Sequence, residues 1–116
     1  MATFAAILDA KRRQQAAMEE RHPGTLLING TAYPGAIVTG QEPQMTLEGT
    51  VTQQRTLVFS VLIAKLPLSV VRDASSLTMK RLRCTHVETG ITYVLREEWT
   101  DPNGVTRRLT LAQAEG

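Results

Sequence analysis

The sequence has few of the residues that build disulfide frameworks and metal sites. It contains one cysteine and two histidines in 116 residues. A single cysteine excludes an internal disulfide and a cysteine-based zinc site, and His22 and His86 are far apart without a ligand pattern. Cys84 and His86 could share one strand face as nucleophile and base, but no third orienting group accompanies them. We therefore expect Cys84 to be a small core residue in a reducing compartment, with no metal and no cofactor.

Long apolar runs and a strong net charge are also missing. No stretch approaches the roughly 20 apolar residues that cross a bilayer. Asp9 and the basic residues 11–13 interrupt the apolar run that a signal peptide would need. The formal net charge is only +2, and the basic residues are spread along the chain, so charge alone does not indicate nucleic acid. We expect synthesis in the cytoplasm and no membrane partner.

Sequence motifs of catalysis are absent as well. There is no glycine-rich phosphate loop, no HExxH pattern and no Gly-x-Ser-x-Gly elbow. Glu97 and Glu98 are adjacent on a predicted strand and would point to opposite faces, which is poor geometry for acid–base work. We expect one of them to be solvated and the other to pair with a cross-strand arginine, Arg107 or Arg108. No catalytic residue and no enzymatic activity is predicted.

What the sequence does contain is a series of strand patterns, clearest in residues 80–111. Leu82 and Cys84 alternate with arginines, and Tyr93 and Leu95 alternate with polar residues, which is the period of a half-buried strand. Glycines at 90 and 104 allow the chain to reverse between these runs. The pattern predicts a three-stranded antiparallel meander over residues 79–87, 91–100 and 105–111.

Residues 2–21 predict an N-terminal helix. They are strong helix formers without glycine or proline, Thr3 can cap the start, and His22-Pro23-Gly24 ends the helix. Its second half is almost wholly polar. The helix either lies across the barrel end with its first two turns buried, or projects as an arm that orders against another subunit. The candidate partner-binding residues of the arm are Phe4, Ile7, Leu8, Arg12 and Met18.

A hairpin and a polar segment follow the helix. Asn29-Gly30 predicts a tight turn within residues 25–39, and Pro34 suggests an edge position or a bulge at the edge of the sheet. Residues 40–56 are either two arms of a long hairpin turning near Glu48-Gly49 or a mobile loop; a long polar insertion in a small domain is usually functional or disordered. The candidate partner-binding residues here are Gln44, Met45, Leu47, Val51 and Arg55.

The remaining segments complete a single small domain. Residues 57–66 are nearly all apolar and predict a strand buried on both faces, and residues 67–76 predict a bend with one helical turn. The fold class is mainly β: a small antiparallel barrel or sandwich of six to seven strands with an N-terminal helix and a long polar loop. The sequence predicts a single domain, with a helical arm over residues 1–22 and a barrel over residues 25–112.

Several arginines of the meander could share one face. This face would be solvated and matched with acidic neighbours, or it would face DNA by approaching the phosphate backbone, or it would contact another subunit. The stacking aromatics of a single-strand binder are missing, since most of the few aromatic residues suit the core. The residues concerned are Arg81, Arg83, Arg96, Arg107 and Arg108.

The whole layout resembles the head–tail joining proteins of tailed bacteriophages, the head-completion or stopper class of the neck. The resemblance lies in the polar arm, the first hairpin, the polar segment 40–56 and the buried strand ending in Leu66-Pro67. It continues in Leu82-x-Cys84, Gly90-x-x-Tyr93 and Asp101-x-x-Gly104 before Leu109-x-Leu111.

This resemblance implies a structural virion protein of the neck. Such a barrel assembles into a ring, commonly sixfold, between a portal or adaptor protein on the head side and a tail terminator or tail tube protein on the tail side, around packaged DNA. The arm and the segment 40–56 would then order on these neighbours. An alternative function is a small nucleic-acid-binding barrel that uses the arginine face.

Overall fold

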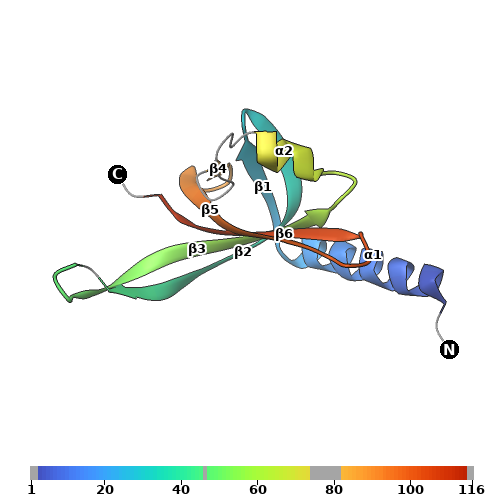
Figure 1. Cartoon of the computed structure of the whole chain (residues 1–116), viewed down its shortest axis with the longest axis horizontal. Helices are drawn as coiled ribbons and strands as arrows, with labels where there is room; N and C mark the ends of the chain where they lie inside the picture. The colour runs from blue at the N-terminus through green and yellow to red at the C-terminus, as the bar shows by residue number, and fades with distance from the viewer. Residues whose placement is uncertain (1–2, 46, 74–81, 115–116) are drawn as a thin grey trace.

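The protein is a closed six-stranded antiparallel barrel with a helix at its N-terminus, as a computed structural model shows (Figure 1). The structure describes residues 3–45, 47–73 and 82–114. The strand order around the barrel is β1-β2-β3-β6-β5-β4, closed by the pairing of β1 with β4. This confirms the predicted fold class. The elements are α1 (Phe4–Arg21), β1 (Pro23–Ile28), β2 (Thr31–Met45), β3 (Val51–Leu62), α2 (Leu68–Asp73), β4 (Arg83–His86), β5 (Ile91–Thr100) and β6 (Thr106–Gln113).

The core fills the inside of this barrel with side chains from every strand. Alternate residues of each strand point inward, so that apolar residues two apart in sequence meet in one cluster. Phe59 and Tyr93 are the largest fully buried side chains, and Val71 of α2 is buried in the same cluster. The other buried members are Leu26, Ile28, Ile37, Leu57, Val61, Leu66, Leu82, Cys84, Leu95, Leu109 and Leu111.

The first hairpin has the predicted turn. Asn29 and Gly30 both have positive φ, 50° and 83°, as a type I′ turn requires. However, β2 continues through Pro34 instead of breaking there. Pro34 pairs with Thr25 of β1, in the part of β2 that has no β3 partner, so its missing N–H interrupts no ladder on that side. The hairpin is not at a sheet edge, because β1 also pairs with β4.

Residues 40–56 form a long hairpin, which was one of the two predicted alternatives. β2 and β3 stay paired from Ala36↔Ser60 to Met45↔Val51, and Gly49 in the turn has φ 82°. The pairing of β3 with β6 begins only at Thr56↔Ala112. Residues 41–55 are therefore a two-stranded ribbon beyond the barrel, which we call the hairpin arm. The predicted polar loop is thus a regular extension of two barrel strands.

The meander is confirmed in outline. β4, β5 and β6 pair in sequence, with Gly90 and Gly104 at φ 73° and 74° in the turns. The strand predicted over residues 79–87 begins at Arg83 in the described part, and residues 79–81 lie outside it. The apolar run 57–66 leaves the strand after Leu62, where residues 63–66 form turns, and the predicted helical turn is α2.

The molecule is elongated, with principal extents of 55 × 28 × 25 Å. Figure 1 shows the reason: the hairpin arm and α1 leave the barrel in opposite directions along the longest axis. The β5–β6 turn lies on the same side as α1 (Figure 1). The molecule therefore has one projecting element at each end of its longest axis.

Candidate partner-binding surfaces

The first candidate surface is the end of the hairpin arm. Met45 and Val51 face each other across the two strands, and Leu47 follows in the turn. All three apolar side chains are exposed, Leu47 completely. A two-stranded ribbon with exposed apolar residues gains little by itself in water, so this surface is suited to being covered by another molecule. We call Met45, Leu47 and Val51 the tip.

Two other predicted residues of this segment lie elsewhere. Arg55 stands at the base of the hairpin arm, opposite Gln41 and beside Tyr93, and lines a shallow hollow there. The side chain of Gln44 lies outside the described part of the structure. The tip is therefore formed by three of the five predicted residues.

The second candidate surface is α1. Thr3 caps the helix by accepting a hydrogen bond from the Ala6 N–H at 3.1 Å, as predicted. The first two turns are not buried, since Phe4 is 63% exposed and Ile7 is 38% exposed. The alternative with the first two turns packed on the barrel end is thus wrong. The described part of α1 contacts the barrel further along, through β1, β2, β3 and β6.

A glutamine anchors the helix to the barrel. Gln15 is the buried residue of α1, and only 2% of it is exposed. Its Nε2 donates to the Ser60 carbonyl at 2.8 Å, and its Oε1 accepts from Ser60 Oγ at 2.6 Å. Because both partners are buried, the pair fixes the helix at one position on β3. Leu8 and Met18, predicted as partner contacts, are half-buried on this face, while Arg12 is exposed.

An ion pair ties the same helix face to the β5–β6 turn. Lys11 Nζ lies 2.6 Å from Asp101 Oδ1, which also accepts from the Asn103 N–H. The Asp101 side chain is buried, and its Oδ2 has no hydrogen-bond partner in the described part of the chain. The hydrogen bond from Lys11 holds the pKa of Asp101 below its usual range. Lys11 therefore positions the β5–β6 turn against α1.

A groove of about 150 Å³ lies between α1 and the β5–β6 hairpin. Trp99 of β5 forms one wall and is 46% exposed. The Arg108 guanidinium of β6 stands over the Trp99 ring, 5.1 Å from its centroid, in a cation–π contact. Met18 of α1 also lines the groove. The groove thus combines an aromatic surface with positive charge.

Arg107 does not belong to an exposed basic face, contrary to the prediction. It is 3% exposed, and its Nε donates to the Leu66 carbonyl at 2.9 Å. Its Nη1 donates to Thr100 Oγ1 at 2.8 Å and to Glu98 Oε1 at 2.5 Å. The prediction that a glutamate of β5 pairs with a cross-strand arginine is met by this Glu98–Arg107 pair. The network joins β5, β6 and the segment before α2.

The other predicted arginines are dispersed. Arg83 and Arg108 are exposed on different strands, and Arg96 is exposed but pairs with Glu42. Arg81 lies outside the described residues. Within residues 3–45, 47–73 and 82–114, the predicted basic stripe is interrupted by one buried and one paired arginine.

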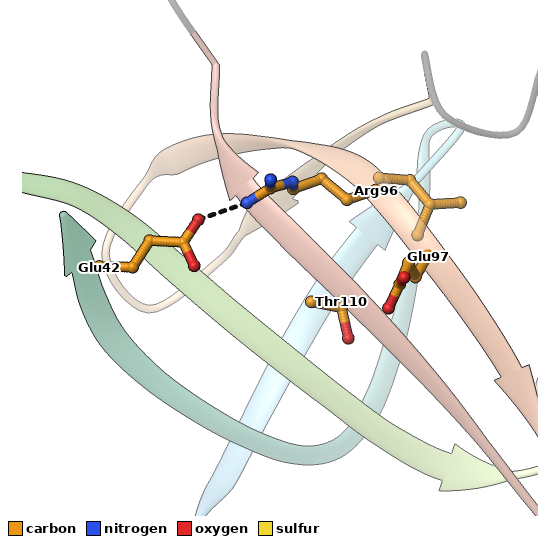
Figure 2. Close-up of a pocket in the computed structure, with 5 residues that line it drawn as sticks. Glu42, Arg96, Glu97 and Thr110 are labelled. Carbon is orange, nitrogen blue, oxygen red and sulfur yellow. Dashed lines mark hydrogen bonds and ion pairs between the residues drawn. The ribbon is translucent and has the colours of Figure 1, made fainter. Parts of the chain in front are cut away.

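The Arg96–Glu42 pair crosses an open hollow of about 470 Å³ on the barrel surface (Figure 2). Glu42 comes from the hairpin arm and Arg96 from β5, and Thr110 of β6 and Glu97 of β5 also line the hollow (Figure 2). The pair links the base of the hairpin arm to the meander across two intervening strands. An exposed ion pair of this kind contributes only about 0 to 1 kcal/mol to stability.

Cys84 and His86 lie in the barrel wall. Both are buried, and burial raises the pKa of the Cys84 thiol to about 12. His86 Nδ1 lies 3.0 Å from Thr89 Oγ1, and His86 Nε2 lies 3.4 Å from Glu88. A thiol with this pKa is protonated at neutral pH, which is unfavourable for a nucleophile. Cys84 fills space in the core, as predicted.

Trp99, Gln15 and Asp101 were not among the predicted site residues. Strict alternation from Tyr93 and Leu95 would point Trp99 inward, but a bulge between Leu95 and Glu97 reverses the phase, and Trp99 becomes exposed. No sequence signal marks that bulge. Gln15, in contrast, lies seven residues after Leu8 and could have been placed on the barrel-facing side of the helix.

No protein-family model and no curated protein sequence matches this chain. Neither helix in the described part has the length and apolar character needed to cross a membrane. The described residues also contain no group of three histidine, cysteine or acidic side chains that could hold a metal ion. The candidate sites are therefore the tip, the exposed start of α1 and the groove beside Trp99.

Proposed function

We propose that this protein is a structural component of a tailed-bacteriophage neck. In this role it forms a ring that joins the DNA-filled head to the tail and helps to close the DNA channel. Its neighbours are a portal or adaptor protein on the head side and a tail terminator or tail tube protein on the tail side. The role is mechanical and involves no catalysis.

The observation that carries this proposal is the pair of projecting elements. A ring subunit needs adhesive segments that reach neighbouring molecules, and the hairpin arm and α1 extend from opposite ends of a 55 Å molecule (Figure 1). Both carry exposed apolar side chains, namely Leu47 on the arm and Phe4 on the helix. Exposed apolar side chains that are grouped together, as Met45, Leu47 and Val51 are in the tip, are typical of protein interaction surfaces.

The hollows of the barrel fit this role better than an enzymatic one. The hollow of about 470 Å³ contains an arginine already paired with a glutamate, and the groove beside α1 contains a lysine already paired with Asp101. The one thiol is buried. The nucleic-acid alternative has less support, because Arg107 is buried and Arg96 is paired, which leaves a discontinuous basic face.

The experiment that tests the proposal mixes the purified protein with DNA-filled tailless heads and images the complexes along the neck axis. We expect a ring of added density at the portal vertex and none elsewhere on the head. Heads that lack the portal serve as the control. A protein that ignores heads but binds bare DNA, with an affinity that falls steeply as salt rises, would overturn the proposal in favour of the nucleic-acid alternative.

A further inference from the structure

The tip and the groove beside Trp99 are complementary in chemistry. The tip presents three exposed apolar side chains. Glu48, which follows Leu47 in the same turn, adds a carboxylate that forms no ion pair with a described residue. The groove presents Trp99 and Met18 as apolar surface, with the cation of Arg108 at its rim. An apolar turn with one negative charge therefore meets an aromatic surface with one positive charge.

The two surfaces cannot meet within one molecule. The tip ends the hairpin arm on one side of the barrel, and the groove lies between α1 and the β5–β6 turn on the other side (Figure 1). A contact between them must therefore join two molecules. Because the two patches differ, the contact is head-to-tail and repeats from molecule to molecule, closing into a ring where the rotation permits.

We propose that the tip of one copy docks into the groove between α1 and the β5–β6 hairpin of a second copy. Leu47 packs against Trp99 and Met18, and Glu48 pairs with Arg108. This contact deepens the proposed function, since it rests on the ring and names the surfaces that would form it. The buried Gln15–Ser60 pair and the partly buried Lys11–Asp101 pair hold the two walls of the groove in place before docking.

The structure favours a second copy over an unrelated partner for two reasons. The charges match, because Glu48 beside the tip and Arg108 at the rim of the groove are both exposed and form no ion pair with a described residue. The groove also exposes a tryptophan, the side chain most enriched at the energetic centre of protein interfaces. Both halves of the contact are already present in this one sequence.

The test uses single variants of each half in sedimentation velocity over a concentration series. Leu47→Asp at the tip and Trp99→Ala in the groove should each weaken self-association about thirtyfold, as expected for a residue at the centre of an interface. Val87→Asp is the matched control, because Val87 is an exposed apolar residue in the β4–β5 turn. This control should associate like the original chain.

A mixture of the two single variants gives the sharper result. In a head-to-tail contact, the Trp99→Ala chain keeps its tip and the Leu47→Asp chain keeps its groove. At a concentration where each variant alone is mostly monomeric, the mixture should therefore form dimers and nothing larger. An exchange of charges, Glu48→Arg together with Arg108→Glu, should restore in one chain the association that each change weakens alone.

Three results would overturn the inference. They are self-association that is unchanged in both single variants, a mixture that stays monomeric, and an original chain that is monomeric throughout the series. The proposed function is tested separately, because a chain that is monomeric in solution can still add to tailless heads. A tip variant that self-associates normally but no longer adds to heads would assign the tip to another virion protein.

Discussion

Gln15 and Ser60 exchange two hydrogen bonds across the contact between α1 and the barrel. The amide of Gln15 donates to the backbone carbonyl of Ser60 and accepts from its hydroxyl. Gly35 lies against the same site, since a Cβ there would stand 2.8 Å from the Ser60 carbonyl oxygen and from the Phe59 ring. A tightly packed polar pair therefore holds a helix that has little apolar surface of its own.

Replacement of Gln15 by alanine should destabilise the protein by about 2 kcal/mol, because a buried hydroxyl and a buried carbonyl lose their partner. The measurement is the free energy of unfolding in urea. Gln14→Ala, one residue away on the exposed side of the helix, is the control and should have little effect. Equal stability of the two variants would show that the pair does not anchor the helix.

Arg107→Met should cost about 3 kcal/mol of stability, because it removes a buried cation and leaves Glu98 without its partner. Arg107→Lys should rescue little, since one ammonium cannot reproduce the planar guanidinium that reaches Leu66, Thr100 and Glu98 together. Arg108→Met is the matched control, because Arg108 is exposed. Thermal unfolding of the three variants measures the difference, and a similar loss from Arg107→Met and Arg108→Met would contradict this account.

The Lys11–Asp101 pair predicts a loss of stability in acid. The pKa of Asp101 is lower in the folded protein than the ordinary value of about 3.9, so the pair stabilises the fold above that pH and stops doing so as the pH falls through the lowered pKa. In Lys11→Met the pKa of Asp101 rises toward its unfolded value, so the protein should be less stable at neutral pH and should lose less stability on acidification than the original chain. Urea unfolding at a series of neutral to acidic pH values measures this.

The control for this experiment is Arg13→Gln, which removes an exposed ion pair with Asp9. An exposed pair contributes little, so the acid dependence of this variant should match that of the original chain. A Lys11→Met chain that loses as much stability between neutral and acidic pH as the original chain would show that Lys11 does not govern Asp101.

Cys84 should resist thiol reagents in the native protein. Burial raises the pKa of its thiol to about 12, so very little thiolate forms at neutral or mildly alkaline pH. Labelling should therefore occur only when the barrel opens and should accelerate in step with urea unfolding. The chain has one cysteine, so the signal is unambiguous. Labelling in native buffer at the rate of a free thiol would contradict the burial of Cys84.

The strands could be predicted from the sequence because their alternation and turn glycines are local signals. The pairing of β1 with β4, which closes the barrel, joins residues about 58 positions apart, as in Leu27↔Thr85, and has no local signal. The inward position of Arg107 could have been predicted, because residues two apart on a strand share a face and Arg107 lies two residues before Leu109 and four before Leu111. The exposure of Trp99 was not, because it depends on a bulge that only strand pairing reveals.

The candidate site was predictable to a similar degree. The sequence predicted that residues 40–56 and the N-terminal helix contact partners, and this stays a prediction; the structure shows that Leu47 of that segment and Phe4 of the helix are exposed. The groove could not be predicted, since it forms where α1 meets the β5–β6 hairpin. That meeting depends on the partners of two polar residues, Ser60 for Gln15 and Asp101 for Lys11, and these long-range pairings have no local sequence signal.

The measurement that tests the account most directly uses a chain with a shortened hairpin arm. Residues 43–53 are replaced by Asn-Gly, which supports a two-residue turn and leaves Glu42, Arg55 and every barrel pairing in place. The shortened protein and the original chain are each mixed with DNA-filled tailless heads and imaged. We expect the shortened barrel to unfold at a similar temperature and to add no ring at the portal vertex. A shortened chain that adds a ring as the original does would contradict the central claim that the projecting arm carries the function.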